Sequence, residues 1–257
     1  MRQPTAACRV ILTRPQGRNG GLADLVRRAG LAVIEAPALE IEPLDTPRPN
    51  PRAGDLLVFV SGQAVDAYFS GRRMSWPDGA RACAVGTATA RALEAHVPDD
   101  CILAPEAGQP PDSESLLAAI DGLGLKPARA HILRATQGRD WLAGQLRQRG
   151  WDVACHALYR RSPRIWDRPA CLALAGEGPV VLLVTSLEAL DAIETSLRTQ
   201  GLIWPRRLRI VTLHERIGRR LQCLYADRPD GVLHVTLSSP DEAALFQAIV
   251  AASRQLP

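Results

Sequence analysis

The chain has almost no lysine: Lys126 is the single one, so arginine supplies nearly all of the positive charge. No block of consecutive Lys and Arg residues occurs, and the net charge of +4 is only mildly basic for 257 residues. We therefore expect no nucleic-acid partner. For most of these arginines the simpler interpretation is a GC-rich genome that favours arginine codons. The sharper alternative is recognition of carboxylate or phosphate, which the planar guanidinium binds through two hydrogen bonds.

Long apolar runs are also missing, and none approaches the length of a membrane-spanning helix. The N-terminal stretch, MRQPTAACRVILTRP, has no extended apolar region and no cleavage pattern. These features predict no membrane association, no signal peptide and a cytoplasmic location. The six cysteines form no C-x-x-C pair and no zinc-ligand spacing with histidine, so we expect reduced core residues and no metal site.

The motifs of three common enzyme classes are absent. The sequence contains no G-x-x-x-x-G-K-[ST] loop and no G-x-G-x-x-G after a strand, so nucleotide binding is unsupported. It contains no G-x-S-x-G elbow, which weakens a serine hydrolase hypothesis. A two-domain sugar-nucleotide transferase, which needs a nucleotide site, is weakened as well.

An internal repeat is the strongest positive feature. The segment VILTRPQGRNGGLADL, from Val10, returns from His131 as HILRATQGRDWLAGQL. Further on, FVSGQAV from Phe59 is answered by VTSLEAL from Val184. A repeat of about 120 residues is too long for a solenoid and suits two similar domains with a ligand cleft between them.

Short apolar runs bounded by Gly, Pro or Asp alternate with amphipathic runs, which predicts an α/β fold with doubly wound parallel sheets. The predicted strands are Arg9–Thr13, Ala32–Ile41, Leu56–Val60, Ala82–Val85, Cys101–Ala104, Ala130–Arg134, Asp152–Tyr159, Val180–Thr185, Arg209–Leu213 and Leu233–Leu237. The predicted helices are Gly20–Ala29, Gln63–Phe69, Thr87–His96, Ser113–Ile120, Asp140–Arg149, Leu187–Leu197, Glu215–Leu224 and Asp241–Ser253. Asp112 and Ser239 are expected helix caps.

Several predicted strands end in Ser, Thr or Gly and run directly into a helix. In doubly wound sheets these turns face the crevice, and free N–H groups at helix N-termini attract anions. Ordinary capping uses the same residue types, and it suffices for any single turn. Several such turns in two repeats favour a cleft that holds a polyanion, lined by Ser61, Gly62, Gln63, Gly86, Thr87, Thr89, Thr185, Ser186, Leu187 and Ser238.

Two other side chains are candidates at the same edge. His214 falls at a predicted strand end, while the remaining histidines are interpreted as structural or surface residues. Tyr159 ends a long strand. Two interpretations of it stay open: packing where the chain crosses between domains, and a phenol that donates a proton or hydrogen bond in the cleft.

Five segments in series resemble the uroporphyrinogen-III synthase family. In chain order they are ILTRPQGR, FVSGQAV, AVGTATARAL, ILRATQGRDWL followed by RGWDVACHALYRR, and LLVTSLEAL. The series extends over nearly the full chain, and its order is more specific than any one segment.

The resemblance implies two α/β domains joined by two long crossing strands, in a cytosolic monomer without a cofactor. Its substrate would be hydroxymethylbilane, a linear tetrapyrrole with eight carboxylates, which the family closes to uroporphyrinogen III in heme, siroheme and cobalamin biosynthesis. Ring D is inverted and water is lost, through an azafulvenium cation and a spiro intermediate. Binding and folding of the substrate would do most of the work.

The resemblance also assigns roles to particular residues. Tyr159 matches the family tyrosine that assists departure of the hydroxyl. Ser61, Gly86, Thr87, Thr89 and Ser186 match turns that hold carboxylates, and Arg14 and Arg134 match strand-end positions that contribute charge. Where many members have Gly-Pro-x-Thr, this chain has Leu213-His214-Glu215-Arg216, which indicates His214 or Arg216 as carboxylate ligands instead. Gln63 stands where some members carry Arg or Asn.

The resemblance changes the expected domain bounds. The second strand of each repeat becomes a crossing, so one domain would contain residues 1–38 and 161–257 and the other residues 39–160. The main hypothesis is a cofactor-independent hydro-lyase, monomeric, with room for transient contact with hydroxymethylbilane synthase. The alternative is a non-catalytic two-domain module that binds a small carboxylate ligand.

Overall fold

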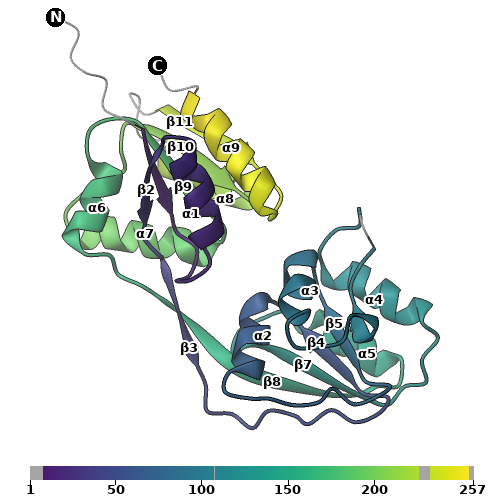
Figure 1. Cartoon of the computed structure of the whole chain (residues 1–257). Helices are drawn as coiled ribbons and strands as arrows, with labels where there is room; N and C mark the ends of the chain where they lie inside the picture. Colours follow the sequence, from purple (N-terminus) through teal and green to yellow (C-terminus); the bar gives the residue numbers. More distant parts are fainter. Residues whose placement is uncertain (1–7, 107, 226–231, 255–257) are drawn as a thin grey trace, which may run out of the picture. The chain divides into compact units, whose positions relative to one another are not determined.

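The structure is a computed structural model that describes residues 8–106, 108–225 and 232–254. Two compact units make up the chain (Figure 1). Unit 1 comprises Met1–Glu40 and Ser162–Pro257, and unit 2 comprises Ile41–Arg161. Each unit is built on one largely parallel sheet with helices on both faces, so the predicted α/β fold class is confirmed.

Unit 1 holds a five-stranded sheet in the order β11-β10-β9-β1-β2, with every neighbouring pair parallel. Its strands are β1 (Arg9–Leu12), β2 (Ala32–Glu35), β9 (Val180–Val184), β10 (Arg207–Thr212) and β11 (Val232–Leu237). Its helices are α1 (Gly20–Arg28), α6 (Arg168–Ala175), α7 (Leu187–Thr199), α8 (Glu215–Tyr225) and α9 (Glu242–Arg254).

Unit 2 holds a six-stranded sheet in the order β3-β8-β7-β4-β5-β6. Its strands are β3 (Leu39–Pro43), β4 (Leu56–Phe59), β5 (Arg81–Ala84), β6 (Ile102–Leu103), β7 (Arg129–Ala135) and β8 (Asp152–Pro163). Its helices are α2 (Gly62–Phe69), α3 (Thr87–Leu93), α4 (Ser113–Gly122) and α5 (Trp141–Gln148), with a 3-10 turn at Asp99–Cys101. The strands from β8 to β6 are parallel to one another.

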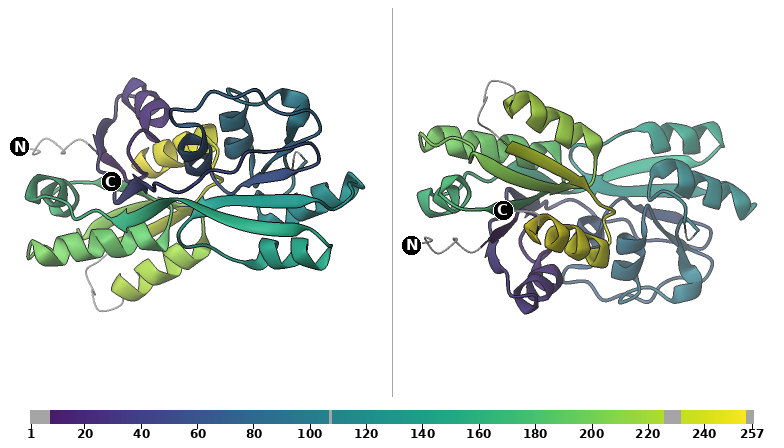
Figure 2. Two further views of the ribbon diagram at one scale, coloured as in Figure 1. Left: turned by 90° about the horizontal axis from the view of Figure 1, so that it is seen from below. Right: turned by 90° about the horizontal axis from the view of Figure 1, so that it is seen from above.

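Alternate side chains of each buried strand pack into two separate hydrophobic cores, one on each face of the sheet, as a sheet with helices on both faces requires. In unit 1, Val10 and Leu12 pack with α1 and α9, while Ile11 packs with α6, α7 and α8. Helices α1 and α9 cover one face of the sheet, and α6, α7 and α8 cover the other (Figure 2). In unit 2, Leu57 and Phe59 pack with α2 and α3, while the other face of the sheet packs with α4 and α5. Both units are therefore three-layered.

The chain passes between the units along β3 and β8, which are neighbours in the unit 2 sheet. The Leu44 N–H donates to the Leu158 carbonyl, and the Arg164 N–H donates to the Ala38 carbonyl. Because residue numbers rise on one strand as they fall on the other, β3 and β8 are antiparallel. The sheets also mix the repeats: β1 of the first repeat pairs with β9 of the second, and β4 pairs with β7.

Three local predictions are wrong. The strand predicted over Ala32–Ile41 is two strands, since the chain around Pro37, which has no N–H, interrupts the ladder. Helix α6 is absent from the predicted helices; Asp167 caps it by accepting the Ala170 N–H, and Pro169 lies in its first turn. The cap of α9 is not Ser239 but the next acidic residue, Asp241, which accepts the Ala243 and Ala244 N–H groups.

The prediction that the cysteines are core residues holds only in part. Cys83 and Cys171 are buried, but Cys155 and Cys223 are exposed. Cys155 lies in the first part of β8, where the consecutive residues Ala154 and Cys155 are both exposed. All six thiols are free.

Candidate active site

The carboxyl ends of the parallel strands in unit 2 meet at one edge of the sheet. Just beyond β4 the Val60 N–H donates to the Leu133 carbonyl over 3.3 Å, and just beyond β7 the Thr136 N–H donates to the Tyr159 carbonyl over 3.0 Å. The turns that follow these strands are therefore neighbours. We call this set of turns, with Tyr159, the carboxyl edge of unit 2.

Ser61 and Tyr159 form a hydrogen bond at this edge. Their hydroxyl oxygens lie 2.9 Å apart although the residues are 98 positions apart in the sequence. Ser61 is also the N-cap of α2, where its Oγ accepts the Ala64 N–H over 3.2 Å. The Tyr159 side chain is 2 % exposed and packs in the core under α2 and α3, while its bond to Ser61 is only partly buried. Packing thus fixes the ring, and Ser61 fixes the hydroxyl.

The pairing register of β7 and β8 places Tyr159 next to Ser61. From Arg129 to Arg134, β7 pairs residue by residue with β8, and Arg134 is opposite Ala157. The register then shifts, so Ala135 is opposite Tyr159 rather than Leu158. Such a shift re-aims a side chain at the end of a ladder.

At Gly86, the turn after β5 lies close to the loop that contains Pro111. Gly86 is the N-cap of α3, and a Cβ at this position would lie 2.8 Å from Cβ of Pro111. Glycine is required here for close approach of the Pro111 loop, since the backbone itself is extended. Thr87 is exposed, whereas Thr89 is buried at 6 % exposure. Thr87 is thus placed to meet a ligand, and Thr89 is placed to pack.

The electrostatics of these helix starts suit an anion. The first turns of α2 and α3 contain no acidic residue. The N–H groups of a first helical turn have no partner within the helix and carry partial positive charge. Ser61, Gly62 and Gln63 form the start of α2, and all three are half-buried. This edge therefore offers backbone donors to a carboxylate without a competing acid.

The two strand-end arginines, Arg14 and Arg134, already have partners within the protein. Arg134 forms an ion pair with the α5 N-cap residue Asp140, with Nη1 2.6 Å from Oδ1. Arg14 donates to the α1 N-cap residue Asn19 over 3.3 Å and forms an ion pair of 3.1 Å with Glu242. Each arginine closes the Gln-Gly-Arg loop of its repeat. The positive charge that the resemblance assigns to ligand binding is thus shared with a neighbouring acidic side chain in both units.

The carboxyl edge of unit 1 repeats this arrangement with differences. Ser186 caps α7 by accepting the Ala189 N–H over 3.1 Å, but Glu188 occupies the first turn. His214 and Arg216 are exposed at the start of α8, where Glu215 lies beside them. The other predicted site residues of this unit, Thr185, Leu187 and Ser238, are half-buried, and Leu187 packs against the core.

The structure therefore collects the predicted residues at two edges. Ser61, Gly62, Gln63, Gly86, Thr87, Thr89, Arg134 and Tyr159 belong to unit 2, and Arg14, Thr185, Ser186, Leu187, His214, Arg216 and Ser238 belong to unit 1. Sequence reasoning missed the approach of Pro111 to Gly86 and the exposed Thr136 directly after β7. The strand-then-threonine pattern at Thr136 is a signal of the kind used for the other turns.

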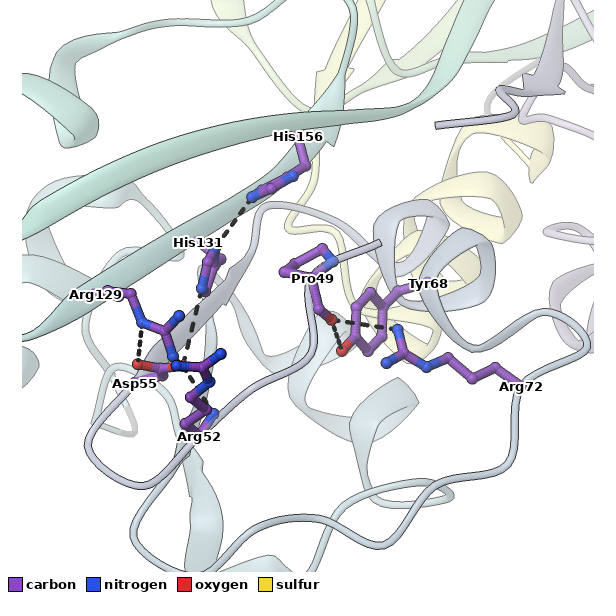
Figure 3. A network of polar contacts seen from close by, with 8 residues as sticks. All are labelled: Pro49, Arg52, Asp55, Tyr68, Arg72, Arg129, His131 and His156. Atoms are coloured by element: carbon purple, nitrogen blue, oxygen red, sulfur yellow. Dashed lines mark hydrogen bonds and ion pairs between the residues drawn. The ribbon is translucent and has the colours of Figure 1, made fainter. Parts of the chain in front are cut away.

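A separate polar network lies at the opposite end of the unit 2 sheet (Figure 3). The buried Asp55 carboxylate, just before β4, accepts two hydrogen bonds from Arg129, of 3.1 and 2.7 Å, and one from the Arg52 N–H. His131 Nε2 lies 3.9 Å from the same carboxylate, and its Nδ1 lies 3.1 Å from His156 Nε2. Burial is the main cause that lowers the pKa of each histidine. These groups stabilise the amino end of the sheet and form no part of the candidate site.

Neither a resident metal nor a membrane span is built into the described residues. Within 8–106, 108–225 and 232–254, no three His, Cys, Asp or Glu side chains are grouped to hold a metal ion. In that same part of the chain, no helix is long and apolar enough to cross a membrane.

Comparison with known proteins identifies the family. A model of the family described as uroporphyrinogen-III synthase HemD matches residues 21–227. A uroporphyrinogen-III synthase of Proteus mirabilis is 31% identical over 164 residues, covering 59% of this chain and 79% of that protein.

Solved structures support the same fold. Uroporphyrinogen-III synthetase from Helicobacter pylori matches with a TM-score of 0.58 at 14% identity, over 95% of this chain and 98% of that one. A mutant uroporphyrinogen III synthase from Thermus thermophilus matches with a TM-score of 0.53 at 18% identity, over 97% of this chain and 100% of that one. The resemblance drawn from the sequence is confirmed: the chain belongs to the uroporphyrinogen-III synthase HemD family.

Proposed function

We propose that this chain closes hydroxymethylbilane to uroporphyrinogen III, with inversion of ring D and loss of water. Family membership supports the reaction, and the hydroxyl pair of Ser61 and Tyr159 at the carboxyl edge of unit 2 is the observation that carries it. The step breaks a C–O bond, so the enzyme is a carbon–oxygen lyase. The closure forms and breaks bonds without changing the overall oxidation state, so it needs no electron carrier, and we propose that the enzyme works without a cofactor.

The substrate carboxylates are bound by the turns at the carboxyl edges. In unit 2 the first turns of α2 and α3 provide backbone donors, with Thr87 exposed beside them. A carboxylate at such a position gains charge-assisted hydrogen bonds and a favourable helix field. In unit 1 the exposed His214 and Arg216 take this role, in place of the hydroxyl turn that many family members have.

Tyr159 is the proton donor in this proposal. Departure of the D-ring hydroxyl leaves a cation on the substrate, and a phenol that protonates the hydroxyl turns it into water. Tyr159 suits this role because its ring is fixed by packing and its oxygen is held by Ser61. The remaining acceleration comes from holding the flexible chain of four rings in a conformation ready to close.

The setting of the enzyme follows from the same proposal. We place it in the cytoplasm as a monomer, and the six free thiols fit a reducing compartment. A transient contact with hydroxymethylbilane synthase would shorten the path of an unstable substrate.

The test is to incubate the purified chain with hydroxymethylbilane, oxidise the products to porphyrins and separate the isomers. We expect the type III isomer to predominate and to form faster as the chain concentration is raised. Spontaneous closure in buffer gives the type I isomer and serves as the control. Type I product alone, from a folded chain, would contradict the proposed function.

A further inference from the structure

The hydroxyl of Ser61 has two partners with different consequences. It accepts the Ala64 N–H at the start of α2, and it shares a hydrogen bond of 2.9 Å with the hydroxyl of Tyr159. A hydroxyl has one proton to donate and can accept at two lone pairs. The direction of the bond between Ser61 and Tyr159 therefore decides where the phenolic proton points.

The helix favours one direction. Accepting the Ala64 N–H draws electron density from the Ser61 oxygen and makes its O–H a stronger donor, because hydrogen bonds in a chain polarise one another. If Ser61 donates to Tyr159, the phenolic proton is released for a different acceptor. If Tyr159 donated to Ser61, that proton would already be engaged.

The internal repeat separates this role from simple capping. Ser186 stands at the repeat position of Ser61 and caps α7 in the same manner, by accepting the Ala189 N–H. Leu39 stands at the repeat position of Tyr159 and carries no hydroxyl. A helix cap explains serine in both units. Only in unit 2 does the repeat place a phenol, that of Tyr159, in contact with the capping serine.

We propose that Ser61 is a positioning residue for the proton transfer by Tyr159, an inference that rests on the proposed function. Ser61 donates to the Tyr159 oxygen and so directs the phenolic proton to the departing hydroxyl of the substrate. The C–O bond breaks with its electron pair on oxygen, the proton completes a water molecule, and a phenolate faces the substrate cation. The proton lost from the substrate when the ring closes returns to the phenolate, so the cycle balances.

Two contacts stabilise the phenolate in this scheme. The hydrogen bond from Ser61 becomes charge-assisted as the negative charge forms, and such bonds are about twice as strong as neutral ones. The N-terminus of α2, with no acid in its first turn, adds a favourable field. Both effects act on the negative charge of the phenolate, which is absent from the neutral ground state. They therefore increase kcat and leave substrate binding unchanged.

A set of variants measures this role. Ser61→Ala removes the hydroxyl and the cap, Ser61→Gly removes the hydroxyl at only a small capping cost, and Ser61→Thr keeps both. Asp167→Ala removes the cap of α6, a helix of unit 1, whereas Ser61 and Tyr159 belong to unit 2, so this variant controls for cap loss alone. Each variant is checked for folding by thermal melting, and its kcat and KM for type III product are measured.

We expect Ser61→Ala and Ser61→Gly to lower kcat roughly 10-fold to 100-fold with little change in KM, which is the usual effect of losing a hydrogen bond to a charged group. Ser61→Thr restores most of kcat. Asp167→Ala lowers the melting temperature as Ser61→Ala does but keeps the wild-type kcat. In a Tyr159→Phe background, Ser61→Ala lowers kcat no further, because both changes remove one shared function.

Three results would overturn the inference. One is a Ser61→Ala effect confined to KM, since a direct substrate contact is then the role of Ser61. Another is an equal fall in kcat in the Tyr159→Phe background. The third is a folded Ser61→Gly chain with wild-type kcat. All three presuppose an active wild-type chain, whereas a folded wild type that forms no type III product contradicts the proposed function itself.

Discussion

His131 Nδ1 lies 3.1 Å from His156 Nε2, so two neighbouring strands of unit 2 share a hydrogen bond between imidazole rings. Burial lowers the pKa of His131, opposed by the charge of Asp55 and assisted by that of Arg129. For His156 burial comes first and the charge of His131 adds to it. Both shifts favour the neutral form of the imidazole in the folded chain.

This pair predicts a loss of stability in acid. Because the folded pKa of each ring lies below its unfolded value of about 6.5, the unfolded chain takes up protons first as the pH falls. The stabilising contribution is complete above about pH 6.5 and is lost as the pH falls through the folded pKa values. We expect the urea midpoint to fall more between about pH 7.5 and about pH 5.5 in wild type than in His156→Gln. The exposed His234, replaced in the same way, is the control, and equal pH dependence in wild type and His156→Gln would contradict this account.

Replacement of Tyr159 by phenylalanine tests the proton donor. The variant keeps the ring that packs in the core and removes only the hydroxyl, so we expect little change in melting temperature. General acid catalysis contributes about 100-fold or more, so kcat should fall strongly, while substrate folding preserves some activity. Steady-state assays of type III product measure kcat and KM of the variant and of the wild type. Full activity in the folded variant would remove Tyr159 from the mechanism.

The cysteines should react in an order set by their burial. Cys83 is fully buried, and desolvation raises the pKa of its thiol to about 12. Thiol reagents attack the thiolate, so Cys83 should react only after unfolding, whereas the exposed Cys155 and Cys223 react first in the native chain. Timed alkylation followed by peptide mass spectrometry gives the order. Early native labelling of Cys83 would show that the core around β5 opens more readily than its packing indicates.

The approach of Pro111 to Gly86 predicts a steric penalty. Gly86→Ala places a methyl group 2.8 Å from the Pro111 side chain, so the loop must shift. We expect a loss of about 1 to 3 kcal/mol, as for other overpacked sites, together with weaker substrate binding. Gly144→Ala within α5 is the matched control: outside the adjacent backbone of its own helix, no atom lies within 4 Å of the added Cβ, so it should stabilise the chain by about 1 kcal/mol. Urea unfolding compares the two variants. An unchanged midpoint in Gly86→Ala would contradict the prediction, since it would show that the Pro111 loop moves away without a cost in stability.

The sequence predicts the fold class because the repeat and the alternating apolar runs depend on local spacing. It also singles out Ser61 and Tyr159 separately, one as a strand-end serine and the other as the end of a long strand. It does not reveal their contact, which depends on the register shift that places Ala135 opposite Tyr159. A shift of one residue leaves no mark in the apolar pattern when neighbouring residues are both buried, as Leu158 and Tyr159 are.

Other features escape sequence reasoning for different physical reasons. The Asp55 network joins the residue before one strand to the side chains of two others, so only the assembled sheet brings these groups together. Helix α6 is obscured because proline serves both linkers and first helical turns. The ion pairs of Arg14 and Arg134 depend on side-chain conformations in their loops, which the strand-end position alone does not specify.

The isomer composition of the product tests the central claim most directly. Purified chain is mixed with freshly prepared hydroxymethylbilane, and the ratio of type III to type I uroporphyrin is measured at complete consumption, against heat-denatured chain as control. The account predicts a predominance of type III that rises with chain concentration and disappears on denaturation. A product that stays type I at every concentration of folded chain would contradict it.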